Sequence, residues 1–216
     1  MQPKAEILLK STKAYERMLN KEYLVTVGKN QQLKSYKLVF TEYEYQHLFG
    51  LHKLKDRPNI TRASSKKNFN KILNSVLDCE SIVSSEFYSI IENRVENIAD
   101  LEQYIDSFNE VYDWDKSKAR SDIVGNIMIP NKSIQNNKDN IYIFFNDGGT
   151  ESAELKIGDI IIGEFNIKIE IPVSFIVEPD KDYTANLVRP AIVLYKEKLN
   201  KATQEKVILL NNLSMQ

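Results

Sequence analysis

Hydrophobic residues recur along the chain with two different spacings, and each spacing predicts one kind of element. Over residues 4–20 they stand at helical intervals, which predicts an amphipathic helix. Two segments rich in β-branched and aromatic residues, 22–27 and 33–40, follow it. The polar sequence GKNQQ lies between them, so the pair predicts a β-hairpin.

Helical spacing returns after the hairpin. The sequence TEYE at residues 41–44 has the spacing of a capping box and predicts a helix over residues 42–54. The polar stretch 55–67 contains a proline and predicts a loop. Apolar positions at helical spacing then predict helices over 68–106, with a break at 79–84, and these helices are expected to be mostly scaffold.

The second half of the chain is rich in strand patterns separated by turn sequences such as NDGGT and EPDKDY. The expected strands are 123–129, 141–145, 154–157, 165–171, 173–177, 192–196 and 206–210. An N-terminal helix and hairpin, central helices and then a run of antiparallel strands indicate an α+β fold with the helices on one side of the sheet. No internal repeat or low-complexity linker is present, so residues 1–216 are expected to form a single domain.

Composition limits the cellular setting. With 42% hydrophobic residues in 216, the chain has enough apolar material for a packed core. Its apolar runs are short and lysines interrupt the N-terminal segment, so neither a membrane span nor a signal peptide is expected. Cys79 is the only cysteine, which excludes an intrachain disulfide and fits a reducing, cytoplasmic location.

The formal net charge of −1 hides an uneven distribution. Residues 1–80 hold 15 Lys and Arg against 8 Asp and Glu, whereas residues 81–216 hold 14 against 22. Between residues 51 and 71 Asp56 is the only acid among seven basic residues: Lys53, Lys55, Arg57, Arg62, Lys66, Lys67 and Lys71. Such a cluster suits a polyanion such as RNA, and it is equally typical of a solvated loop and helix face.

Common catalytic motifs are missing. The chain has no GxxxxGK[ST] or GxGxxG phosphate loop, no HExxH and no GxSxG, so ATP, dinucleotide, zinc-protease and serine-hydrolase chemistry have no support and no cofactor is expected. The two histidines, His47 and His52, are five residues apart. On a continuous helix they would diverge by roughly 140°, so they are expected to point in different directions and not to form a metal site.

The residues around the histidines nevertheless match one kind of chemistry. Cleavage of RNA through its own 2′-hydroxyl needs a base, an acid and a cation, and no metal. His47, His52, Lys53 and Lys55 supply these residue types, and Tyr43, Tyr45 and Phe49 could offer ring faces for bases. The alternative is that both histidines only complete a core.

A second segment, PVSFIVEPDKDY, places Ser174 among apolar strand residues. A buried hydroxyl there needs a partner and could hold a phosphate, whereas a serine on the solvent side of the strand would have no such role.

Together these motifs resemble a known family. The succession KSYKLVFTEYEYQHLFGLHKLKD, a strand feeding an aromatic-rich helix with His-Leu-x-Gly-Leu-His-Lys-Leu, resembles the phage-associated nuclease-like domains grouped with barnase, EndoU, colicin-type tRNases and RelE. It is most similar to the fourth of the phage-linked subfamilies, and the late strands also fit. His47 and Gly50 match the HLxG signature, His52 and Lys53 match the segment after it, and Ser174 matches the late-strand serine.

The resemblance implies an α+β fold with helices preceding a curved antiparallel sheet, and a toxin-like, metal-independent endoribonuclease of phage or mobile-element origin. In that case His47 or His52 is the general acid or base, Lys53 or Lys55 the cation, and Ser174 a phosphate contact. The expected RNA-binding residues are Tyr43, Lys55, Arg57, Arg62, Lys66 and Lys67. The expected partners are RNA, with tRNA among the candidates, and an immunity or antitoxin protein. The alternative is a non-enzymatic phage-associated protein that binds nucleic acid or protein through residues 51–71.

Overall fold

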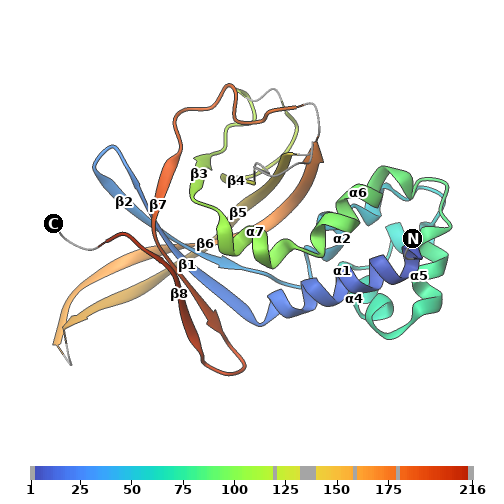
Figure 1. The fold of residues 1–216 in the computed structure, drawn as a ribbon, viewed down its shortest axis with the longest axis horizontal. Coiled ribbons are helices and arrows are strands. Elements are labelled where there is room, and N and C mark those ends of the chain that lie inside the picture. Colours follow the sequence, from blue (N-terminus) through green and yellow to red (C-terminus); the bar gives the residue numbers. More distant parts are fainter. Residues whose placement is uncertain (1–2, 119–120, 132–139, 158–159, 179–180, 214–216) are drawn as a thin grey trace.

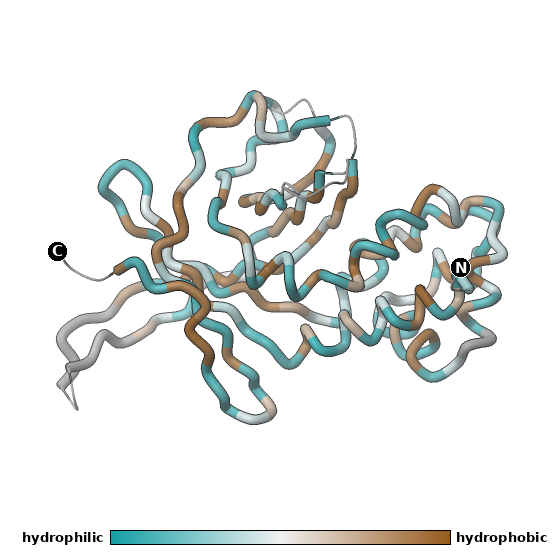
Figure 2. The backbone as a smooth tube through the Cα atoms, viewed as in Figure 1, coloured by the Kyte–Doolittle hydropathy of each residue, from teal (hydrophilic) through white to brown (hydrophobic). Residues whose placement is uncertain are grey.

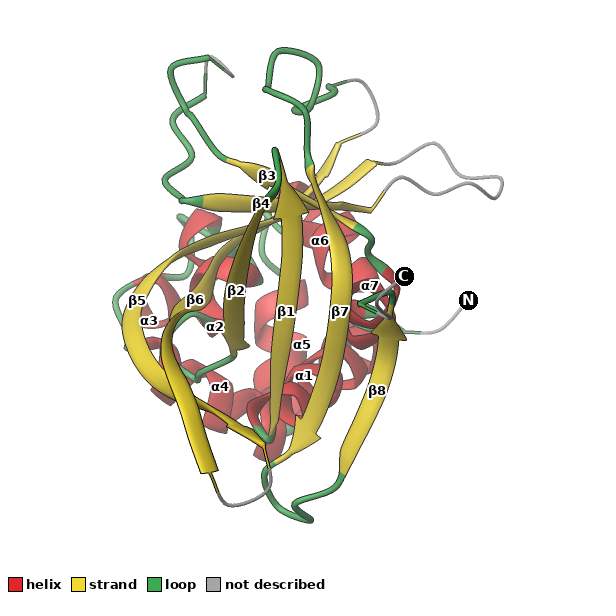
Figure 3. Cartoon of the chain, turned by 90° about the vertical axis from the view of Figure 1, so that its left-hand side faces the viewer, coloured by secondary structure: helices red, strands yellow, loops and turns green. Residues whose placement is uncertain are grey.

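Helices and strands gather at opposite ends of the molecule (Figure 1). The computed structural model describes residues 3–118, 121–131, 140–157, 160–178 and 181–213. Seen from the strand end, the sheet curves in front of the helices (Figure 3). This arrangement confirms the predicted α+β fold with the helices to one side of a curved sheet.

The N-terminal helix α1 (Lys4–Leu19) confirms the first predicted element and lies at the centre of the helical part. Tyr15 is fully buried on it, and its ring is the hub of an aromatic cluster. Its neighbours, with ring centroids 5.7 to 6.3 Å away, are Phe40, Tyr45, Phe49 and Phe69. The Tyr15 hydroxyl donates to the Thr41 carbonyl at 2.7 Å, which ties α1 to the chain that leaves the hairpin.

The remaining helices are short and alternate between hydrophilic and hydrophobic stretches (Figure 2). They are α2 (Tyr45–Leu48), the 3-10 helix η1 (Leu51–Lys53), α3 (Pro58–Thr61), α4 (Ser65–Asn74), α5 (Val76–Val83), α6 (Ser89–Ile98) and α7 (Leu101–Ser107). No helix in the described part of the chain is long and apolar enough to cross a membrane.

Two predictions for this region were wrong. The stretch 55–67 is not one loop, since it contains α3 and the start of α4. The predicted break at 79–84 falls largely within α5, and the chain breaks instead at the extended residue Ser75, whose hydroxyl accepts the Asp78 N–H at 3.4 Å. A local side-chain cap therefore sets this boundary.

In the described part of the chain, eight strands form one sheet in the order β1-β2-β6-β5-β4-β3-β7-β8, and β1 also pairs with β7. The additional pairing closes the first seven of these into a barrel, and β8 extends β7 beyond it. The strands are β1 (Lys21–Lys29), β2 (Gln32–Val39), β3 (Glu110–Asp113), β4 (Ile127–Asn131), β5 (Asn140–Ile157), β6 (Ile160–Glu178), β7 (Ala191–Asn200) and β8 (Lys206–Asn211).

The sheet differs from the prediction in three respects. The pairing of β2 with β6 is parallel, whereas a purely antiparallel sheet was expected. The predicted strands 154–157, 165–171 and 173–177 are parts of two long strands, β5 and β6, whose register shifts at bulges. The short strand β3 was not predicted, because four residues are too few for a periodic signal.

Apolar side chains pack on both faces of the sheet. The larger core joins the helices to the barrel. The smaller core lies on the opposite face of β4, β5 and β6, since its residues alternate along the strands with those of the larger one. Its buried members are Tyr112, Trp114, Met128, Tyr142, Phe144, Ile176 and Tyr183. It holds the segment after β6 in place, because the Tyr183 ring packs edge-on against three other rings of this core.

A buried lysine joins the barrel to α7. Lys196 on β7 is 1% exposed, and its ammonium donates to the carbonyls of Ile105, Asp106 and Phe108 at 3.2, 2.9 and 2.6 Å. These carbonyls lie at the C-terminal end of α7, where a helix leaves acceptors without intrahelical partners. Burial lowers the pKa of Lys196 to about 8, against the opposing effect of Asp106.

We expect Lys196→Met to lower the free energy of unfolding by about 2–4 kcal/mol, because it leaves buried carbonyls without a donor. Urea unfolding followed through the fluorescence of Trp114 measures the loss. Lys206→Met is the matched control, since Lys206 is an exposed lysine on β8 with a 3.6 Å ion pair to Glu197, and we expect it to change stability by no more than about 0.5 kcal/mol. Equal losses in the two variants would contradict the structural role.

Candidate active site

The two histidines lie in a segment that buried aromatic residues anchor to the core. Tyr45 and Phe49 are fully buried, so the expectation that their rings offer faces to bases was wrong. Their ring centroids are 4.2 Å apart, and the Tyr45 hydroxyl shares a 2.7 Å hydrogen bond with the hydroxyl of Thr12. The predicted capping box is not formed. Instead, the Thr41 hydroxyl donates to the Glu44 carboxylate and accepts the Tyr43 N–H at 3.2 Å, and the helix begins only at Tyr45.

Gly50 ends this helix after a single turn. It has φ 73° and ψ 16°, a left-handed conformation that glycine adopts far more readily than other residues. A Cβ atom at this position would lie 2.9 Å from Ile91 Cγ2 and 3.2 Å from Arg94 Nη1, both on α6. The close approach of the chain to α6 therefore requires glycine, and the 3-10 helix η1 follows in a new direction.

The reversal at Gly50 brings the two imidazoles together. The ring centroids of His47 and His52 are 4.9 Å apart with an interplanar angle of 41°. The prediction that they point in different directions was wrong, because it assumed one continuous helix over residues 42–54. Both histidines are exposed, so they do not complete a core.

Arg94 on α6 contacts the backbone of the histidine segment. Its Nη1 atom donates to the His47 carbonyl at 3.2 Å. Burial lowers the pKa of Arg94 to about 10, while the nearby charges of Glu178 and Tyr183 act in the opposite direction. The guanidinium thus lies between the histidine segment, the end of β6 and the aromatic residue that follows β6.

Lys53 is a second cation in the same place. It is half-buried on η1, and its pKa is lowered by burial and by Arg94, with Glu178 opposing. Two cations therefore share one carboxylate. One carboxylate cannot neutralise both cations, so the remaining positive charge would attract an additional anion such as a phosphate.

His52 differs from an ordinary histidine. Its pKa is lowered by partial loss of hydration and then by the neighbouring His47, Arg94 and Lys53, while a hydrogen bond with the Gln46 backbone opposes these effects. The ring is consequently neutral at pH 7 and can accept a proton. A neutral imidazole beside a second imidazole and two cations can move protons next to an anionic group.

Comparison with known proteins identifies the family of the chain. A family model described as phage-Barnase-EndoU-ColicinE5/D-RelE like nuclease4, PBECR4, matches residues 7–213. The chain belongs to the PBECR4 family. The predicted resemblance is thereby confirmed, and so is the broad class of nuclease-like protein. No curated protein and no solved structure matches the chain.

The expected RNA-binding residues of this PBECR4 chain fall into two groups. Lys55, Arg62, Lys66, Lys67 and Tyr43 are exposed, and Lys66 forms a 2.8 Å ion pair with Glu42.

Arg57 is instead occupied within the fold. It donates to the carbonyl of Ser81 and to the carbonyl and hydroxyl of Ser84, at 2.9 to 3.0 Å. These acceptors lie at the end of α5, so Arg57 has a structural role there.

Ser174 does not join the histidines. It is half-buried on β6 opposite Phe144, on the face of the smaller core. Four residues separate it from Glu178, roughly 13 Å along the strand. The residue of β6 whose charge acts on Arg94 and Lys53 is Glu178, which raises the pKa of both.

Sequence reasoning missed Arg94, Glu178 and the position of Tyr183 in this site. A signal for Arg94 was present, since it lies three residues after Ile91 and four before Ile98, both buried on α6. A charged residue within an apolar stripe needs a partner, and Arg94 finds one in the His47 carbonyl, while the charge of Glu178 on β6 raises its pKa. Glu178 gave no signal, because only the tertiary fold brings it to α6.

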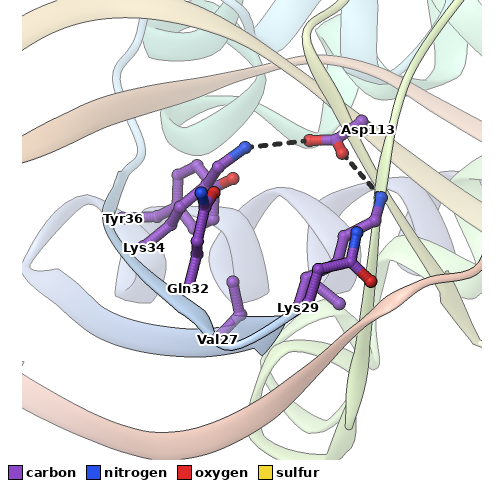
Figure 4. Close-up of a pocket in the computed structure, with 8 residues that line it drawn as sticks. Val27, Lys29, Gln32, Lys34, Tyr36 and Asp113 are labelled. Carbon is purple, nitrogen blue, oxygen red and sulfur yellow. Dashed lines mark hydrogen bonds and ion pairs between the residues drawn. The ribbon is translucent and has the colours of Figure 1, made fainter.

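A separate cavity of about 190 Å³ lies at the tip of the β1–β2 hairpin (Figure 4). The Asp113 carboxylate stands between the ammonium groups of Lys29 and Lys34, at 2.8 and 3.7 Å. The hairpin tip lies at the strand end of the molecule, whereas α2 lies among the helices on the other side of the barrel (Figure 1). Since Asp113 already offsets the charge of these lysines, a phosphate gains less here than beside the histidines.

We expect Gly50→Ala to destabilise the fold and to separate the imidazoles, because the new methyl group meets α6 and the backbone is strained. Gly149→Ala is the matched control, since Gly149 also has a positive φ, 108°, but its Cβ would meet nothing within 4 Å. Backbone strain alone costs about 1–3 kcal/mol, and Gly50→Ala should exceed the control by the cost of the clash. Urea unfolding tests this, and equal losses would show that α6 does not constrain Gly50.

We expect His52 to titrate below pH 6.5 and to shift upward in His47→Gln. Its protonated form is disfavoured in the native state, so its contribution to stability is present above pH 6.5 and is lost as the pH falls through the lowered pKa. With only two histidines in the chain, NMR titration of the imidazole signals assigns both. Lys55→Gln is the control and should leave His52 unchanged. An unaltered His52 titration in His47→Gln would contradict the coupling.

Proposed function

We propose that this PBECR4 chain is a metal-independent endoribonuclease that acts in the cytoplasm, with His47 and His52 as its acid–base pair. The observation that carries the proposal is the 4.9 Å contact of the two imidazoles beside Arg94 and Lys53. Membership of a nuclease-like family supports the class of reaction.

The reaction is cleavage through the 2′-hydroxyl of the substrate. His52 is neutral at pH 7 and takes the 2′-hydroxyl proton, the 2′-oxygen attacks phosphorus, and the 5′-oxygen leaves with a proton from His47. The products carry a 2′,3′-cyclic phosphate and a 5′-hydroxyl. Arg94 and Lys53 stabilise the negative charge that gathers on the phosphoryl oxygens in the transition state.

The exposed basic residues Lys55, Arg62, Lys66 and Lys67 extend this site. Their side chains are exposed, and we propose that they bind phosphates of the RNA next to the scissile bond, with Lys66 exchanging its ion pair with Glu42 for a phosphate. We include tRNA among the substrates, and we expect a toxic nuclease of this type to have an immunity or antitoxin protein that covers the histidines. Growth arrest on expression, relieved by a neighbouring gene, would identify such a partner.

Purified wild type, His47→Ala, His52→Ala and Arg94→Gln should be incubated with total RNA and with tRNA in EDTA. We expect wild type to produce discrete fragments with cyclic phosphate ends. Each histidine variant should be slower by about 100- to 10,000-fold, and Arg94→Gln by about 100-fold or more. The melting temperature of each variant separates lost chemistry from lost folding.

A DNA oligonucleotide of the same sequence is the substrate control, because it has no 2′-hydroxyl. Lys206→Ala is the protein control, since Lys206 lies on the remote strand β8. Cleavage of the DNA, or cleavage that survives both histidine substitutions, would refute the proposed reaction.

The second candidate is a non-enzymatic nucleic-acid-binding protein. The exposure of Lys55, Arg62, Lys66 and Lys67 favours it as well. In that case folded wild type would not cleave RNA, and affinity would fall with salt and with each lysine or arginine removed, independently of the histidines.

A further inference from the structure

Tyr43 is exposed in a way that sets it apart from the other tyrosines. The chain has 11 tyrosines, all within the described residues, and ten of them are buried or half-buried. Tyr43 is 68% exposed. An aromatic ring left in solvent, when the fold buries the others, is available to a ligand.

Tyr43 is exposed on the same short segment of the chain as the two histidines. Between residues 41 and 52 the exposed positions are Tyr43, His47 and His52, while the residues between them are buried or half-buried. The helix α2 begins at Tyr45, and the Leu48 N–H donates to the carbonyl of Glu44, the residue before it, at 2.9 Å. Tyr43 lies in the turn directly before α2, four residues ahead of His47.

The position of Tyr43 is fixed by the start of α4. The Ser65 hydroxyl donates to the Glu42 carbonyl and accepts the Gln46 N–H, both at 2.8 Å, so it bridges the two sides of Tyr43. Lys66 follows Ser65 and reaches Glu42 at 2.8 Å. The ring therefore lies on a tied backbone beside the first turn of α4, which carries two exposed lysines, Lys66 and Lys67.

We propose that Tyr43 is a stacking platform for an unpaired base adjacent to the phosphate held at the histidines, and that the substrate is accordingly single-stranded RNA. This inference rests on the proposed function. A base can stack on a side-chain ring only when its face is free, as in loops, bulges and ends, whereas bases within a duplex cover one another. Lys66 and Lys67 then hold the backbone of the stacked nucleotide.

Binding is measured by fluorescence anisotropy with a labelled oligoribonucleotide that is fully 2′-O-methylated and cannot be cleaved. The probe is used alone and annealed to its complement. We expect wild type to prefer the single strand. Tyr43→Ala and Tyr43→Leu should weaken single-strand binding by about 5- to 150-fold, the effect of losing one stacked base, and Tyr43→Phe should stay within about twofold of wild type.

Phe165→Ala is the matched control, because Phe165 is an exposed aromatic residue on the projecting β5–β6 hairpin, away from α2 (Figure 1). It should leave binding unchanged. Equal affinity of wild type and Tyr43→Leu for the single strand, or equal weakening on single strand and duplex, would overturn the proposal.

Cleavage of the unmethylated RNA, measured in parallel, distinguishes this failure from failure of the nuclease. If wild type cleaves RNA and Tyr43→Leu cleaves single strands as fast as wild type, the platform is refuted and the nuclease is retained. If wild type binds the single strand through Tyr43 but cleaves nothing, the nuclease is refuted and the platform is retained.

Discussion

A chain that must reverse direction against the face of a helix has few conformations available, and Gly50 adopts one that other residues avoid. The left-handed backbone at Gly50 allows the chain to touch Ile91 and Arg94 with no side chain between them. It also ends α2 after one turn and starts η1. The contact between His47 and His52, and the reach of Arg94 to the His47 carbonyl, both follow from this one turn.

The segment around Gly50 is held in place by contacts with its neighbours. From below, Tyr45 and Phe49 anchor the segment in the aromatic cluster around Tyr15. The helix α6 supplies Arg94, which donates to the His47 carbonyl, and the charge of Glu178 at the end of β6 raises the pKa of Arg94. The candidate site is therefore built where the helical part meets the rim of the barrel, and its groups come from three segments far apart in the sequence.

The sequence predicted much of the fold because periodicity reports burial directly. The N-terminal helix, the hairpin and most strands were found in this way, and the HLxG motif identified the histidine segment. The local geometry of that segment was not predicted, since helical spacing over residues 42–54 hides a left-handed glycine in its middle. Gly50 was visible as a glycine within a helical pattern, which usually marks a helix end or a close approach.

The parallel pairing of β2 with β6 and the partnership of Arg94 with Glu178 could not be predicted from local pattern. Both involve segments that are distant in the chain. Hydrophobic periodicity reports which residues of one element are buried, and it does not report which other element they contact. Ser174 illustrates the same limit, because the strand was recognised correctly while the residue of that strand that faces the site is four positions later.

The barrel pairing also has a consequence for the order of folding. Lys21 of β1 pairs with Asn200 of β7, so β1 completes this pairing only after a segment far later in the chain has been made. Contacts of such long sequence separation form slowly. A nascent chain that has not yet reached residue 178 carries both imidazoles but lacks the carboxylate of Glu178. The barrel and the complete candidate site therefore form well after the histidine segment has been synthesised.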